Sequence, residues 1–114
     1  MKSRILIADD HDEFRSMLKN YLLNQDLELE VYEASTGEMA VMKASCVKPD
    51  IVLMDINLPH SNGILAAKQI KGDFPQSDII FLTVFDIEPF RKASKEIQAR
   101  GFISKSDLYD ELIP

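Results

Sequence analysis

Three aspartates, a threonine and a lysine stand at the ends of short apolar runs in this chain: Asp9, Asp10, Asp55, Thr83 and Lys105. Three carboxylates brought close together repel one another, so a site of this composition needs a counter-charge. Carboxylate ligands without thiols or clustered imidazoles suit Mg²⁺. The three carboxylates, one Mg²⁺ and Lys105 would together carry no net charge. Such a balance suits a site that receives a phosphoryl group.

Each of these residues also has an ordinary explanation when it is taken alone. An Asp-Asp pair before a helix usually serves as a cap, and an aspartate after a strand usually forms a turn. A lysine such as Lys105 is usually a solvated surface residue. The prediction of a site therefore depends on how these residues are arranged as a set. That arrangement is determined by the elements that position them.

The elements that must position these residues are predicted by alternating apolar patterns. Five short runs read as strands, and the third and fourth are apolar almost throughout, as in strands buried on both faces. The strands are Arg4–Ala8, Leu29–Ala34, Asp50–Met54, Ile79–Thr83 and Phe102–Ser104. Helical spacing occurs between them, in Phe14 to Leu22, Glu38–Val47, Ile64 to Phe74 and Phe90 to Ile97. This alternation predicts an α/β domain with a five-stranded parallel sheet and right-handed crossovers.

The carboxyl ends of parallel strands meet at one edge of a sheet, where such folds bind ligands. The polar residues named above should therefore converge there. We expect caps at Asp12 and at Ser35 or Thr36, a left-handed residue at Gly101 and a loop over Pro59–Gly63. Met39, Met42 and Cys46 are expected to pack in the core.

Length and composition limit the class of protein. The 114 residues fit one domain, 1–114, and 46% hydrophobic content excludes intrinsic disorder. No segment is apolar for long enough to span a membrane, and a net charge of −6 argues against nucleic-acid binding by this domain. The single cysteine, Cys46, favours a reducing, cytoplasmic setting. Only Ser106–Pro114 follow Lys105, so the last helix looks truncated and any output domain would lie beyond residue 114.

Taken together, these motifs resemble those of the receiver domain of two-component response regulators. The resemblance runs from ILIADDH through LMDINLP and FLTVFD to GFISK, with a LuxR/NarL-type character. It implies a flavodoxin-like, doubly wound (βα)5 fold in three αβα layers, with strand order 2-1-3-4-5.

The resemblance also implies roles for individual residues. Asp55 would be the phosphoacceptor. Asp10 and Asp55 would hold Mg²⁺ directly, together with the backbone carbonyl of Asn57, and Asp9 would act through water. Lys105 would pair with Asp55 and then with the phosphoryl group.

The conformational switch implied by the resemblance consists of Thr83 and Phe102. The Thr83 hydroxyl would bond a phosphoryl oxygen, and Phe102 would move inward, although it also fits an ordinary half-buried strand aromatic. Many receivers have proline after the lysine; here Ser106 leaves the state of the Lys105–Ser106 peptide undecided.

The function implied is a signalling domain, not an enzyme with a separate substrate, although it would catalyse its own phosphorylation and dephosphorylation. The phosphoryl group would come from a histidine kinase or a histidine phosphotransfer protein. Phosphorylation would favour a homodimer, and the output would be DNA-binding transcription regulation. A stand-alone receiver or phosphorelay protein is the alternative.

Three other classes compete with this interpretation. A Mg²⁺-dependent phosphatase or phosphotransferase usually has a second acid two residues after its nucleophile, but here Asn57 stands in that position. A flavodoxin-type nucleotide or flavin module would need glycines in the turn after the first strand, whereas this chain has acidic residues there. A degenerate receiver used only for docking would not need all five polar residues.

Overall fold

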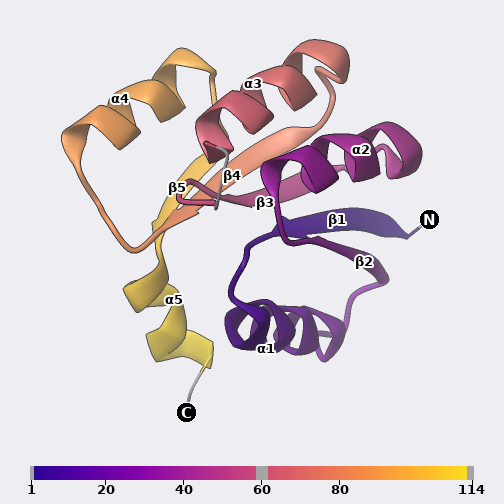
Figure 1. Cartoon of the computed structure of the whole chain (residues 1–114). Helices are drawn as coiled ribbons and strands as arrows, with labels where there is room; N and C mark the ends of the chain where they lie inside the picture. The colour runs from indigo at the N-terminus through magenta and orange to yellow at the C-terminus, as the bar shows by residue number, and fades with distance from the viewer. Residues whose placement is uncertain (1, 59–61, 113–114) are drawn as a thin grey trace.

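The computed structural model describes the backbone of residues 2–58 and 62–112 and the side chains of these residues up to Leu108. One sheet of five parallel strands forms its centre, in the order β2-β1-β3-β4-β5 (Figure 1). The strands are β1 (Ser3–Ala8), β2 (Leu29–Ala34), β3 (Ile51–Asp55), β4 (Asp78–Thr83) and β5 (Gly101–Ser104). Both the predicted strands and the strand order are confirmed, with boundaries within one residue.

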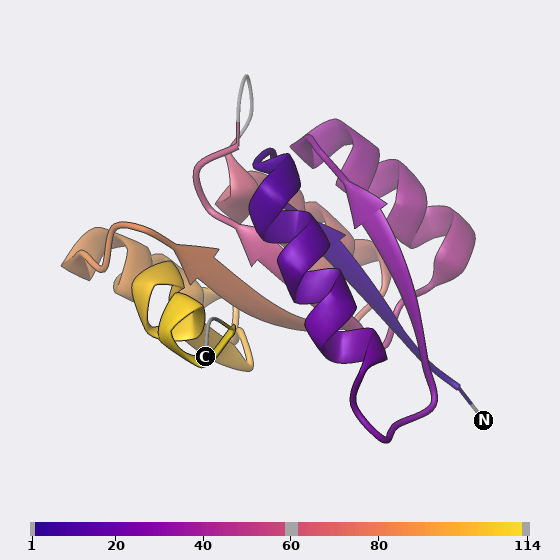
Figure 2. The same cartoon turned by 90° about the horizontal axis from the view of Figure 1, so that it is seen from below.

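Five helices cover the two faces of the sheet. They are α1 (Asp12–Leu23), α2 (Gly37–Val47), α3 (Gly63–Asp73), α4 (Glu88–Glu96) and α5 (Lys105–Leu112). Helices α2, α3 and α4 lie on one face, and α1 and α5 lie on the other, as Figures 1 and 2 show from two sides. The molecule therefore has the three-layer, doubly wound architecture expected of a flavodoxin-like domain.

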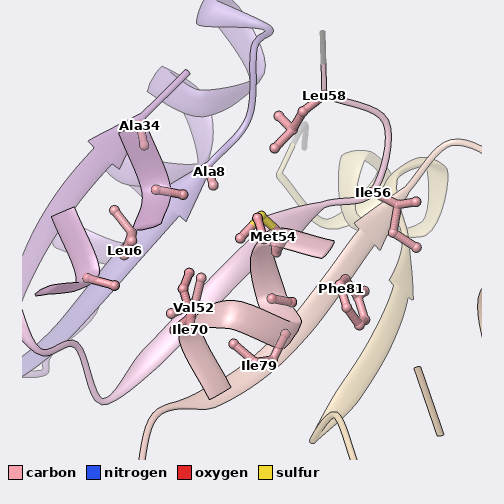
Figure 3. Close-up of a cluster of buried hydrophobic side chains, with 14 residues drawn as sticks. Leu6, Ala8, Ala34, Val52, Met54, Ile56, Leu58, Ile70, Ile79 and Phe81 are labelled. Atoms are coloured by element: carbon pink, nitrogen blue, oxygen red, sulfur yellow. The ribbon is translucent and has the colours of Figure 1, made fainter. Parts of the chain in front are cut away.

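The strands alternate their side chains between two cores. Leu6, Val52 and Phe81 belong to the cluster beneath α2, α3 and α4, which is drawn in Figure 3. Ile7 and Leu53, their neighbours in sequence, belong to the cluster beneath α1 and α5. Successive residues of a strand point to opposite faces, so strands apolar throughout must be covered on both sides. Burial on both sides holds the strand ends, and hence the site, in fixed relative positions.

The helix ends differ in part from the sequence-based expectations. Thr36 caps α2 as predicted, because its side chain accepts the N–H of Met39 at 3.1 Å. The cap predicted at Asp12 was wrong: His11 is the extended capping residue, and its N–H is bonded to the carboxylate of Asp9 at 2.8 Å. The left-handed residue near the end of α4 is Gln98, with φ 58°, so the prediction for Gly101 was also wrong.

The side chains of α2 correct a further prediction. Met39 and Met42 are exposed, and so is Cys46. The helix presents Ala40 and Ala44 to the sheet instead, both fully buried. Small side chains let the helix approach the strands closely, which leaves the larger residues on its outer surface.

Three further expectations concern the Lys105–Ser106 peptide bond, the loop before α3 and membrane-spanning helices. All peptide bonds of the described residues are trans, including Lys105–Ser106. Of the predicted loop, residues 59–61 lie outside the described residues, and Gly63 already begins α3. None of the helices in the described ranges is long and apolar enough to cross a membrane.

Candidate functional site

The carboxyl edge of the sheet brings the predicted polar residues together. Asp9 and Asp10 follow β1, Asp55 ends β3, Thr83 ends β4 and Lys105 follows β5. The strands run parallel in the order given above, so their last residues share one edge. The convergence expected from the sequence is confirmed.

Lys105 forms the centre of this cluster. Its ammonium lies 2.6 Å from Oδ2 of Asp9 and 3.1 Å from Oδ2 of Asp55, and it sits 4.7 Å from the centre of the Phe14 ring. Only the Asp55 contact was expected. Burial alone would lower the pKa of Lys105, but the hydrogen bonds and charges of the two aspartates outweigh it and raise that pKa. Lys105 therefore remains a cation inside the site.

Asp55 is only 2% exposed, and its environment works against its negative charge. Burial raises the pKa of its carboxyl group, and the neighbouring charge of Asp9 raises it further. Lys105 and the N–H of Asn57, which donates to Oδ1 at 3.0 Å, oppose this without cancelling it. Each oxygen of Asp55 thus has one fixed hydrogen-bond donor, while its negative charge is incompletely neutralised.

The acidic group fits a divalent cation. Asp9, Asp10, His11 and Asp55 each offer one ligand atom, and these atoms lie within 4.8 Å of one another. Oδ1 of Asp10 is buried and accepts no hydrogen bond from any described residue, although Nδ1 of His11 lies 3.3 Å away. A buried carboxylate oxygen without a donor is costly unless a cation satisfies it. Because most of these ligand atoms are oxygens, the four residues suit Mg²⁺.

The hydroxyl of Thr83 is engaged elsewhere in this structure. It accepts the N–H of Phe85 at 2.9 Å and lies 3.1 Å from the Phe85 carbonyl oxygen, to which it donates. Thr83 is fully buried, whereas Phe85 is largely exposed. The hydroxyl therefore holds the start of the β4–α4 loop and would have to leave these bonds to reach a group on Asp55.

Phe102 lies in β5, half-buried against the core beneath α4. The guanidinium of Arg91 stands over its ring, 4.9 Å from the ring centre. Arg91 is itself paired with Asp86 in the β4–α4 loop. The aromatic ring is thus connected through Arg91 to the loop that Thr83 holds.

Sequence reasoning missed three residues that shape this edge. His11 places Nδ1 3.1 Å from Oδ1 of Asp9 and 3.3 Å from Oδ1 of Asp10. Arg15 donates to the backbone carbonyl of Asp9 at 2.6 Å. Gly63 lies directly against the backbone of Asp55. The acidic residues next to His11 could have indicated its place in the site, but nothing in the sequence pattern indicated the roles of Arg15 and Gly63.

This fold and site define a class of small α/β modules that carry a buried Asp–Lys–Asp cluster at the carboxyl edge of their sheet. The chain belongs to the response regulator receiver domain family, which it matches over residues 5–113.

The relatives agree with this assignment. The transcriptional regulatory protein YxjL of Bacillus subtilis is 35% identical over 113 residues, covering 98% of this chain and 51% of YxjL. The response regulator protein VraR of Staphylococcus aureus is 39% identical over 94 residues, covering 80% and 44%. The crystal structure of a LuxR-family two-component response regulator from Aurantimonas sp. SI85-9A1 matches with a TM-score of 0.82 at 29% identity, covering 93% and 76%. The chain thus spans about half the length of the curated relatives it matches.

Proposed function

We propose that this receiver domain accepts a phosphoryl group on Asp55 from the phosphohistidine of a histidine kinase or a histidine phosphotransfer protein. The observation that carries the proposal is the Lys105 ammonium, which lies buried between the carboxylates of Asp9 and Asp55. A carboxylate at the carboxyl edge of the sheet with one fixed cation beside it is well placed to attack phosphorus. Transfer of this kind depends mainly on position and on neutralised oxygen charge.

In the proposed step a carboxylate oxygen of Asp55 forms a bond to phosphorus, and the bond from phosphorus to the histidine nitrogen breaks. Lys105 turns from the carboxylate to a phosphoryl oxygen, as a flexible point charge can. Mg²⁺ would be held by Asp10, Asp55 and the carbonyl of Asn57, with Asp9 acting through water. When bound, it supplies positive charge to the phosphoryl oxygens.

The same groups should serve the return reaction, in which water attacks phosphorus and releases Asp55. The domain would in this sense catalyse its own dephosphorylation. Between these steps the Thr83 hydroxyl would leave Phe85 for a phosphoryl oxygen, and Phe102 would respond by moving inward. A phosphoryl group adds charge and acceptor oxygens, which can favour one of two arrangements of a loop.

The proposal extends to the protein that contains this domain. Because YxjL carries the name of a transcriptional regulatory protein and is about twice as long, we propose a DNA-binding output beyond residue 114. In this view residues 1–114 form the phosphoacceptor domain of that protein. It would act in the cytoplasm and form a homodimer when phosphorylated. A stand-alone receiver or phosphorelay protein is the alternative.

The test is phosphorylation by a small-molecule phosphodonor with Mg²⁺, followed by intact-mass spectrometry. The wild type should gain one phosphoryl group that hydroxylamine removes, and Asp55→Asn should gain none. Asp73→Asn, at an exposed acid that ends α3, is the matched control and should react as the wild type does. Phosphorylation of Asp55→Asn at the wild-type rate would place the acceptor elsewhere and overturn the proposal.

A further inference from the structure

Arg15 is a well-connected side chain near the site, and the mechanism above does not use it. It lies in α1 with only 16% of its side chain exposed. One terminal nitrogen donates to the carbonyl of Asp9 at 2.6 Å, and the other donates to Asp12 at 2.7 Å. Its Nε donates to Glu33 of β2 at 3.0 Å. The guanidinium therefore joins the β1–α1 turn to the edge strand.

The carbonyl that Arg15 binds belongs to the peptide unit between Asp9 and Asp10. A peptide unit is planar, so the direction of this carbonyl helps to set the position of the Cα of Asp10. The preceding N–H, that of Asp9, is bonded to the carbonyl of Ala34 at 3.0 Å. The backbone of Asp9 is therefore held on both sides by β2, directly through Ala34 and indirectly through Arg15 and Glu33.

We propose that Arg15 is a positioning residue that aims the carboxylate of Asp10 at the cation, which makes the site's affinity for Mg²⁺ depend on the edge strand β2. This inference rests on the proposed function, because it takes Asp10 as a direct ligand. The partners of metal ligands commonly affect metal affinity by about tenfold or more, because they fix where the ligand atoms lie.

The charge of Arg15 and its hydrogen bonds predict opposite effects of its removal on the affinity for Mg²⁺, which makes the inference testable. A cation near a Mg²⁺ site repels the metal, so removing the charge alone should tighten binding. If Arg15 instead positions Asp10, its removal should weaken binding. Lys19 offers a matched control, since its ammonium also pairs with Glu33, at 3.3 Å, and this ion pair does not involve Asp9.

The experiment is a Mg²⁺ titration followed by the amide shifts of Asp10 and His11, on the wild type, Arg15→Met, Arg15→Lys and Lys19→Met. We expect Arg15→Met to bind Mg²⁺ about tenfold more weakly. Lys19→Met should bind equally well or slightly more tightly. Arg15→Lys keeps the charge but lacks the planar fork, so it should also bind more weakly than the wild type.

Phosphorylation rates provide a second readout. For Arg15→Met the rate should fall at low Mg²⁺ and return to within about twofold of the wild-type rate at saturating Mg²⁺, because the reacting groups themselves are intact. A general loss of structure would lower the rate at every concentration. If Arg15→Met does not fold, the affinity of Arg15→Lys decides the question.

Wild-type affinity in both Arg15 variants, or equal weakening in Lys19→Met, would overturn the inference and leave the proposed function standing. If the wild type itself binds no Mg²⁺, the proposed function fails and this inference falls with it. The two failures are therefore distinguishable in one titration series.

Discussion

Asp55 and Lys105 show how the charge at this edge is balanced residue by residue. One ammonium group pairs with two buried carboxylates, so the site without a bound metal ion keeps an excess of negative charge. Ionised groups held in such surroundings destabilise the fold to the extent that their charge is not compensated. The residues that make the site reactive are therefore expected to lower the stability of the metal-free domain.

The first prediction follows from the raised pKa of Asp55. A carboxyl group with a raised pKa binds its proton more tightly in the folded state, so its favourable contribution is present in acid and is lost as the pH rises through that pKa. At pH 7 without metal, Asp55→Asn should therefore be more stable than the wild type. We expect its Tm to be several degrees higher, since 1 kcal/mol corresponds to about 4–8 °C in a small domain.

Thermal unfolding in a chelator at several pH values provides the measurement. The advantage of Asp55→Asn should shrink toward acid, where the wild-type carboxyl group is protonated. A variant that melts at or below the wild-type temperature at pH 7 would show that Lys105 fully compensates the charge of Asp55.

At the scale of elements, α3 and α4 lie on one face of the sheet, and each contacts a residue that the proposed function uses. The first residue of α3, Gly63, donates its N–H to the carbonyl of Ile56 at 2.9 Å. It packs against the backbone that carries Asp55 so closely that no side chain fits between them. On the same face of the sheet, the guanidinium of Arg91 in α4 stands over the ring of Phe102. Two elements thus fix the acceptor and the proposed switch.

The second prediction is that Gly63→Ala damages both stability and reactivity. A Cβ there would overlap the carbonyl oxygen of Asp55 and lie 2.9 Å from the Cα of Ile56. Backbone atoms cannot move aside cheaply, so we expect a loss of about 1–3 kcal/mol in the free energy of unfolding and slower phosphorylation.

Gly72, in the same helix, is the matched control for this substitution. It has no atom within 4 Å of the position a Cβ would take, so Gly72→Ala should stabilise the helix by up to about 1 kcal/mol. Urea unfolding of both variants makes the comparison. Equal effects at the two glycines would show that helix propensity, not contact with Asp55, decides the outcome.

The third prediction concerns the contact between Arg91 and Phe102. An exposed cation–π contact is weak, so its loss should change the populations of two ring positions by only about a few-fold. Arg91→Ala should therefore let the ring of Phe102 sample its inward position before phosphorylation. Ring resonances measured with and without beryllofluoride should then differ less than in the wild type.

Lys92→Ala, at the exposed neighbouring position, controls for the loss of a positive charge from α4. It should leave the Phe102 resonances unchanged. If Arg91→Ala also leaves them unchanged, the ring is held by the core alone, and the loop has no connection to it through Arg91.

At the scale of the whole molecule, the acidic balance of the chain and its site work together. The net charge is −6, and three aspartates meet at one edge of a domain that measures 33 × 30 × 23 Å. A cation bound there relieves local repulsion and favours the folded state, which alone assembles the ligands. The stability of the domain should therefore respond to Mg²⁺.

The fourth prediction is that Mg²⁺ raises the Tm of the wild type. At a concentration one hundred times the Kd, the expected stabilisation is about 2.7 kcal/mol. Asp10→Asn should lose most of this effect, and Asp73→Asn should keep it. Melting curves at constant ionic strength separate binding from screening, and a Tm independent of Mg²⁺ would contradict binding to the folded state.

The sequence by itself determined the elements and the edge at which the site forms. Five apolar runs separated by helical spacing left few alternatives to a parallel sheet, and parallel strands bring their carboxyl ends together. Asp10, Asp55 and Lys105 could thus be assigned to one edge from the sequence alone. The strand order came from resemblance, because periodicity shows which faces are buried but not which strands are neighbours.

Only the tertiary structure decided which atoms meet at that edge. It showed that Lys105 contacts Asp9 as well as Asp55, that the Thr83 hydroxyl is bonded within its own loop, and that Arg15 holds the carbonyl of Asp9. The structure also showed that Met42 is exposed, because the alanines of α2 occupy the space against the sheet. Such contacts depend on how closely packed elements approach one another and on each side chain's choice among rotamers, which residue spacing along the chain does not specify.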